Sequence, residues 1–239
     1  LFSFLCFGSV MYWKEINDAS RILETETLKQ TTVRAKQVNS SITVAVSILF
    51  RDIDHYTKEL IEAFDSKKTA LLNAKIEEIK AKMPNNSVLQ VAIIDAQGYL
   101  TYSNLGFSER LYLGDRKHFK VHTESSEDKL YISEPIFGRV SKEWSIQFTR
   151  SIRENGEFKG VLVFSLSVKY LQKILEDIAL ANNDSLSILK ETGEYLVRNL
   201  DNEKAMGKAL AKERPYTKKD APVQGEFRDV SGFDGVARL

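Results

Sequence analysis

The sequence predicts an α+β fold in which a long N-terminal helix packs along two tandem, small antiparallel-sheet domains, the second of them incomplete. Between residue 14 and about residue 64 the chain contains neither Gly nor Pro, and its apolar residues return at helical spacing. Further along, an apolar run, a polar stretch ending in Gly and a second apolar run occur twice. This is the pattern of a strand, a turn and a strand, so each copy predicts a β-hairpin within a small sheet domain.

The first 13 residues are apolar apart from Ser3, Gly8 and Ser9. A bilayer requires about 20 apolar residues, so this stretch is too short to cross one by itself. The alternatives are the outer end of a transmembrane helix, the core of a signal peptide and a buried apolar segment, and no basic leader or small-residue cleavage site is visible. We favour the end of a transmembrane helix over residues 1–13, which makes the membrane a partner of this chain. The only cysteine, Cys6, lies in this stretch, so the rest has no disulfide framework, which suits an extracytoplasmic domain.

The predicted helix from residue 14 to about residue 64 is about 75 Å long at about 1.5 Å per residue, longer than one small domain is wide. We therefore expect it to run from the membrane along both sheet domains. Its apolar stripe is expected to pack on those domains; the alternative is a dimer seam, although the spacing is not a strict heptad. After a break at residues 65–66, a shorter helix is predicted over Thr69–Met83, because Pro84 disfavours helix at the residue before it. The two helices occupy residues 14–86.

The two hairpin patterns, residues 91–105 and 186–200, lie at a constant offset, as Ile93 and Ile188 show (188 − 93 = 95). A second similarity, between Leu113-Gly114 and Met206-Gly207, has an offset of 93. A period of this length suits two tandem small domains rather than a solenoid; the alternative is that any two hairpins look alike. We predict a first sheet domain over residues 87–168, a connecting helix over 169–183 and a second domain over 184–239. Because this second copy lacks about two of the strands predicted in the first, we expect the native chain to continue beyond Leu239.

Composition and motifs exclude several classes of function. The chain has 34 basic and 33 acidic residues, and no segment concentrates the basic ones, so nucleic acid is not an expected partner. It contains no P-loop, no dinucleotide fingerprint and no Gly-x-Ser-x-Gly elbow, so we predict no enzyme activity and no cofactor for this fragment. His118 and His122 stand four apart on a probable helix, a spacing that suits a metal, but no third ligand is evident. We predict that these two side chains are solvated and bind no metal.

A resemblance to a known family rests on one block of the chain. It includes Gly114-Asp115-Arg116 at a helix start, Tyr131-Ile-Ser-x-Pro in a strand, a strand with Trp144 and the strand 160–166. This block resembles the membrane-distal half of double Cache sensor domains, which are tandem PAS-like extracellular ligand sensors, and it is most similar to those attached to diguanylate cyclases. The resemblance covers residues 14–239 and is strongest from Gln90 to Leu171.

The resemblance implies an extracytoplasmic sensing domain of a receptor in a bacterial or archaeal cell membrane. A small molecule is then expected in the first PAS-like repeat, with the long helix passing the signal to a cytoplasmic output domain and with a homodimer as the assembly. A diguanylate cyclase is the first expectation for the output domain, a histidine kinase the second and a chemotaxis-type domain the third. The alternative is a ligand-free dimerisation or adhesion ectodomain.

The expected ligand site centres on Arg116. Asp115 precedes a helix and is predicted to cap it, which places the Arg116 guanidinium at a helix N-terminus, where a carboxylate or another small anion binds favourably. The alternative is that Arg116 pairs with a neighbouring acid on the surface. Trp144 is the residue most expected to be simply buried. The predicted ligand-binding residues are Asp115, Arg116, His118, Phe119, Tyr131, Ser133, Trp144 and Gln147.

The family pattern also limits the ligand class. Cache domains that bind free amino acids commonly carry Arg-x-Trp-Tyr and an Asp in the last strand, whereas this chain has Arg116-Lys117-His118-Phe119 and Ser165. The acid that would hold an ammonium group is missing, so a carboxylate or another small anion is expected rather than a zwitterionic amino acid. The stretch after Met206-Gly207 has no Asp-Arg pair, so ligand binding is predicted in the first repeat and mechanical coupling in the second.

Overall fold

The computed structural model describes residues 2–64, 69–84, 86–107, 109–179, 185–210, 220, 224–228 and 234–238. Helix α1 spans Phe2–Glu62 and helix α2 spans Ala70–Lys82, as the sequence pattern predicts, while the predicted break at residues 65–66 lies outside the described residues. Across the described part of the chain, no helix combines the length and the apolar character needed to cross a bilayer.

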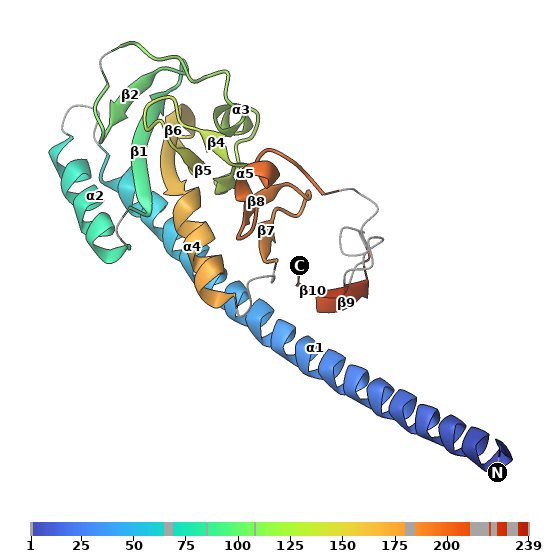
Figure 1. The fold of residues 1–239 in the computed structure, drawn as a ribbon. Coiled ribbons are helices and arrows are strands. Elements are labelled where there is room, and N and C mark those ends of the chain that lie inside the picture. The colour runs from blue at the N-terminus through green and yellow to red at the C-terminus, as the bar shows by residue number, and fades with distance from the viewer. Residues whose placement is uncertain are drawn as a thin grey trace.

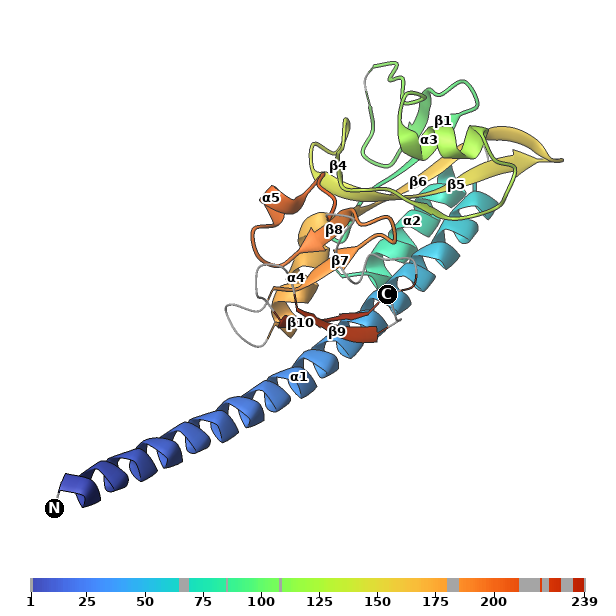
Figure 2. The ribbon, with the colours of Figure 1, turned by 90° about the vertical axis from the view of Figure 1, so that its right-hand side faces the viewer.

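Only the second half of α1 packs on the rest of the chain. Residues 11–31 are exposed, and the first buried apolar side chains of the helix beyond them are Val38 and Ile42. Figure 2 shows the N-terminal half extending away from the sheets. The stripe therefore packs on the rest of the chain through Ile42, Ile53 and Leu60, whereas Ile16, Ile22 and Leu23 at its N-terminal end are exposed.

The main sheet is antiparallel, with the strand order β2-β1-β6-β5-β3, and β4 also pairs with β5. Its strands are β1 (Val88–Asp95), β2 (Leu100–Ser103), β3 (Tyr131–Ile132), β4 (Ile136–Phe137), β5 (Trp144–Glu154) and β6 (Glu157–Ser167). The short helix α3 (Lys117–Thr123) lies on one face of this sheet, and α1 and α2 lie on the other (Figure 2).

Alternation along the strands gives these faces different characters, because successive side chains point to opposite sides of a sheet. On the helix side, Ile93, Phe148 and Phe164 are buried in one core with Ile53 and Leu60 of α1. On the other side, a smaller core includes Ala92, Val163 and Phe119 of α3. The sheet thus lies between the long helix and the face that carries the candidate site.

A second set of elements follows the main sheet. These are α4 (Val168–Ile178), β7 (Ser187–Leu189), β8 (Tyr195–Arg198), α5 (Asn202–Ala205), β9 (Gln224–Arg228) and β10 (Asp234–Arg238) (Figure 1). Strands β7 and β8 pair with each other, as do β9 and β10. The α+β fold class is confirmed. The predicted connecting helix ends at Ile178, and residues 180–184 lie outside the described part.

The two hairpins have the same register. Ala92 pairs with Ser103 in the first, and Ser187 pairs with Arg198 in the second, which are the same positions at the offset of 95. Each hairpin also carries an irregularity at the same place, after Ile93 in the first and after Ile188 in the second. The shared irregularity is more specific than a shared hairpin shape, because bulges are position-dependent features of a strand pair.

An asparagine closes each hairpin in the same way. The side-chain Oδ1 of Asn104 accepts from the Val91 N–H at 2.8 Å, and that of Asn199 accepts from the Leu186 N–H at 2.7 Å. The Asn-Leu ending in both copies of the sequence therefore has a structural cause, since this amide satisfies a backbone donor at the start of the first strand.

The predicted match between Leu113-Gly114 and Met206-Gly207 is wrong in its alignment. Leu113 N–H donates to the carbonyl of Gly98 at 2.7 Å, and the equivalent bond runs from Leu210 N–H to Gly193 at 2.9 Å. Leu210, and not Met206, is thus the counterpart of Leu113 (210 − 113 = 97). Met206 instead ends helix α5, which follows β8. The counterparts of Asp115 and Arg116 then fall outside the described residues. That the second repeat lacks an Asp-Arg pair for ligand binding therefore stays a prediction.

Candidate functional site

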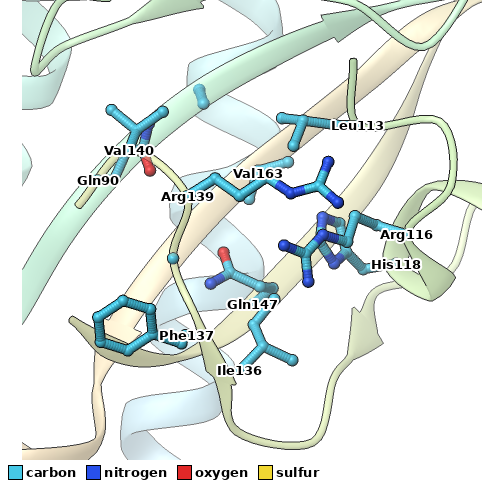
Figure 3. Close-up of a pocket in the computed structure, with 12 residues that line it drawn as sticks. Gln90, Leu113, Arg116, His118, Ile136, Phe137, Arg139, Val140, Gln147 and Val163 are labelled. Carbon is cyan, nitrogen blue, oxygen red and sulfur yellow. The ribbon is translucent and has the colours of Figure 1, made fainter. Parts of the chain in front are cut away.

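A cavity with a volume of about 40 Å³ lies on the face of the main sheet opposite α1. Its floor comes from β1, β5 and β6, and its walls come from the segment before α3, from α3 itself, from β4 and from the segment after β4 (Figure 3). The lining residues are Gln90, Ala92, Leu113, Arg116, His118, Ile136, Phe137, Gly138, Arg139, Val140, Gln147 and Val163.

Two buried glutamines make the floor polar. The Gln147 amide donates to Ser145 Oγ at 2.7 Å and accepts from the Ser165 hydroxyl at 2.5 Å, while the Gln90 amide donates to Ser103 Oγ at 2.8 Å. Each amide nitrogen carries two N–H groups, so each has one donor left without a partner among the described residues. Ser165 therefore serves to orient Gln147, and two amide donors remain for a ligand.

Arg116 contributes an unpaired positive charge. It occupies the N-cap position of α3, and its half-buried guanidinium makes no hydrogen bond or ion pair with any described residue. Burial lowers the pKa of Arg116, and the nearby Arg139 cation acts in the same direction. Because α3 has only seven residues, the guanidinium rather than the helix end is the main attraction for an anion here.

Asp115 does not cap α3, which corrects the sequence prediction. Its carboxylate is held by Arg139, with Nη2 at 2.8 Å from one oxygen and Nη1 at 3.2 Å from the other. Hydrogen bonding to Arg139 holds the pKa of Asp115 below its usual value. A bidentate, charge-assisted pair outcompetes a cap bond to a backbone N–H, which explains the difference.

The two histidines are buried, so the prediction of a solvated pair is also wrong. His118 lines the cavity, and burial lowers its pKa to about 4. Burial likewise lowers the pKa of His122 to about 4. Thr149 donates to the carbonyl of His118 at 3.2 Å, so its oxygen accepts from His122 Nε2–H at 2.8 Å. Both rings are therefore neutral at pH 7, and among the described residues no three His, Cys, Asp or Glu side chains gather as a metal site would require.

Three other predicted residues lie near the cavity without lining it. Phe119 packs against Phe158, with ring centroids 5.9 Å apart. Ser133 is buried and exchanges two hydrogen bonds of 2.9 Å with the backbone of Gln147, so it positions that residue. Tyr131 is half-buried beside His122, and its hydroxyl has no hydrogen-bond partner among the described residues.

Trp144 is not buried, contrary to prediction. It is 41% exposed, does not line the cavity and packs edge-on against Phe137 at 5.8 Å. Its position as the first residue of β5 explains this, because the end of the strand extends past the elements that cover its middle.

Among the lining residues that were not expected from the sequence, two carry polar side chains, Gln90 and Arg139. Gln90 interrupts an otherwise apolar strand, and that interruption is a signal that sequence reasoning could have used. Arg139 offered no such signal, because its contact with Asp115 joins residues 24 positions apart.

Comparison with known proteins identifies the fold. No protein-family model matches this chain, and no curated protein matches it. Among solved structures, the extracellular domain of rpHK1S-Z16, described as a histidine kinase, has a TM-score of 0.74 and 22% identity over 87% of this chain and 88% of that one. The chain has the fold of an extracellular sensor domain.

Two chemoreceptor domains share this sensor fold. The ligand-binding domain of CtaA from Pseudomonas fluorescens, solved with L-valine, has a TM-score of 0.60 and 13% identity over 80% of this chain and 85% of that one. The ligand-binding domain of PctC from Pseudomonas aeruginosa PAO1, solved with GABA, has a TM-score of 0.59 and 15% identity with the same coverage. None of these three structures supports the expected link to diguanylate cyclases.

Proposed function

We propose that this chain is the extracytoplasmic sensing domain of a membrane-bound receptor and that it binds a small monocarboxylate in the cavity beside Arg116. The observation that carries this proposal is the half-buried Arg116 guanidinium, which has no acidic partner among the described residues. Leaving a buried charge unpaired is costly, so an anion that pairs with it binds favourably. A carboxylate matches the fork of a guanidinium with two parallel hydrogen bonds.

The rest of the lining selects against an ammonium group. Among the described residues, no Asp or Glu lines the cavity, and an ammonium would face the like charges of Arg116 and Arg139. Leu113, Ile136 and Val163 instead offer an aliphatic surface. A water-sized sphere needs about 10–15 Å³ on the same measure, so a cavity of about 40 Å³ suits a small ligand.

A route from this cavity to α1 passes through the sheet. Gln147 on the cavity side is followed in β5 by Phe148, whose ring meets Phe50 of α1 edge-on at 5.0 Å. A ligand that binds one arrangement of sheet and helix more tightly than another shifts their populations, and it can do so only through that difference in affinity.

The receptor architecture forms part of the proposal. It comprises the domain boundaries predicted above, an N-terminal membrane anchor, a homodimer and a cytoplasmic output domain. The exposed apolar side chains of Ile16, Leu23 and Val33 on α1 support a homodimer. The similarity to histidine-kinase and chemoreceptor domains favours an output of one of those two kinds.

Calorimetric titration with two matched ligand pairs tests the ligand class. Butyrate is GABA without its amine, and isovalerate is L-valine without its amine. We expect both deaminated acids to bind more tightly than their zwitterionic partners by about tenfold or more, because the ammonium gains no acid and loses water. Equal or tighter binding of L-valine and GABA would overturn the monocarboxylate assignment.

Arg116 variants test the anchor. Arg116→Ala should abolish isovalerate binding while leaving the melting temperature without ligand nearly unchanged, and Arg116→Lys should weaken binding because an ammonium cannot form the bidentate pair. If no carboxylate raises the melting temperature of the wild-type chain, the ligand-free dimerisation or adhesion ectodomain becomes the better account.

A further inference from the structure

We propose that Arg139 determines the affinity of the cavity for a carboxylate by taking the hydrogen bonds of the Asp115 carboxylate, so that Asp115 does not form them with Arg116. Arg139 is then a positioning residue. It acts on the ligand indirectly, because its ion pair with Asp115 keeps that carboxylate from pairing with Arg116. This inference rests on the proposed function of the cavity.

The argument begins with the order of the residues. Asp115 directly precedes Arg116, so the nearest carboxylate to the proposed anchor is its own chain neighbour. Arg139 reaches Asp115 from the segment after β4, on the opposite side of the cavity, and Figure 3 shows its side chain extending toward Arg116. The cavity thus contains two guanidinium groups and one adjacent carboxylate, an excess of one positive charge.

Two further contacts fix Arg139 in this position. Its Nη1 also donates to the carbonyl of Tyr112 at 2.7 Å. The guanidinium therefore binds both the backbone of the segment before α3 and the Asp115 side chain in that segment. The turn that follows is closed by the Gly138 N–H, which donates to the Glu143 carbonyl at 3.0 Å. A Cβ at position 138 would overlap the Ser141 hydroxyl, which fits a tightly closed turn.

The consequence follows from the charges. With Arg139 present, the Asp115 carboxylate forms its hydrogen bonds with Arg139 and none with Arg116, although its charge still acts to raise the pKa of Arg116. Without Arg139, the guanidinium that remains beside Asp115 among the described residues is that of Arg116, and an ion pair between these neighbours cancels the charge that a carboxylate ligand needs. The loss of a residue that need not touch the ligand therefore weakens binding.

A double-mutant cycle with isovalerate as the probe tests this mechanism. We expect Arg139→Gln to weaken isovalerate binding by about tenfold or more and Asp115→Asn to strengthen it, because the second change adds net positive charge. The double variant should recover binding to within about threefold of the wild type, since no carboxylate remains to occupy Arg116. Lys142→Gln is the matched control, because it removes an exposed positive charge from the same turn and does not line the cavity.

Failure of Asp115→Asn to restore binding in the Arg139→Gln background would overturn the inference, because Arg139 would then contact the ligand or close the cavity directly. A crystal structure of the Arg139→Gln chain without added carboxylate decides the point independently. We expect the Asp115 carboxylate within about 4 Å of the Arg116 guanidinium. If isovalerate does not bind the wild type, the proposed function fails, but this structure still tests the inference: an Asp115 that points to solvent would refute it.

Discussion

Arg150 of β5 joins its guanidinium to Asp54 of α1 at one end and to Asp128, in the segment after α3, at the other. Its side chain is 5% exposed, whereas those of Asp54 and Asp128 are 32% and 69% exposed. The long helix and the segment that leaves the cavity wall are thus tied to one buried cation on the helix side of the sheet.

This arrangement predicts that replacing Asp54 and replacing Arg150 lower the free energy of unfolding by different amounts. Asp54→Ala leaves a buried guanidinium whose remaining acidic partner among the described residues is the exposed Asp128, and we expect a loss of about 3 kcal/mol in the free energy of unfolding. Arg150→Met should cost less, because it removes the buried charge and leaves two carboxylates that reach water. Urea unfolding of both variants measures the difference.

Lys58→Met is the control for this prediction. It removes the other partner of Asp54, but this pair lies at the surface, so its cost should stay within about 1 kcal/mol. A larger loss for Arg150→Met than for Asp54→Ala would contradict the account.

The equivalent turn glycines of the two hairpins should respond differently to alanine. Both Gly98 and Gly193 have positive φ, +87° and +94°. A Cβ at position 98 would lie 2.7 Å from Gly114 Cα, whereas at position 193 the nearest atoms, in Leu210, are 3.9 Å away. Gly193→Ala should cost only the backbone strain of about 1–2 kcal/mol, and Gly98→Ala at least about 1 kcal/mol more. Equal losses of stability in thermal unfolding would show that the backbone at Gly114 shifts away from the added Cβ at no cost in free energy.

Acid should destabilise the chain through His118. Its pKa falls from 6.5 to about 4 on folding, so the unfolded state binds the proton more strongly between these values. The stability that the neutral His118 ring contributes is fully present above pH 6.5 and is lost as the pH falls toward 4. His118→Gln should reduce the stability difference between pH 7 and pH 4.5 by about 2 kcal/mol. Replacing the exposed His55 in the same way is the control, and an equal effect there would refute burial as the cause.

Glu134 is predicted to connect the two repeats. Its Oε2 lies 3.5 Å from Lys117 Nζ, on α3, and 3.8 Å from Lys190 Nζ, beside β7. Glu134→Gln should change the free energy of unfolding by less than about 1 kcal/mol, yet amide exchange in the β7–β8 hairpin should accelerate, because Lys190 loses its partner. Glu157→Gln, which removes an ion pair with Lys159 at the start of β6, should leave that exchange unchanged. Unaltered exchange in Glu134→Gln would argue against the connection.

The sequence predicted those parts of the fold that depend on local pattern. The long helix follows from apolar spacing without Gly or Pro, and the first hairpin follows from apolar runs on either side of Gly98. The site was harder, because its decisive contacts join distant segments. Nothing near Asp115 indicates that Arg139 takes its carboxylate, and a seven-residue α3 is too short for periodicity to show that both histidines face inward.

The uncovered part of α1 acts as a lever arm. Residues 11–37 extend for about 40 Å at about 1.5 Å per residue, beyond the first buried apolar contact at Val38. A tilt of about 5° about Val38 displaces the far end of the helix by about 3–4 Å. A small change of angle where α1 packs on the sheet therefore becomes a displacement of several ångströms at the far end, as long as the helix stays straight.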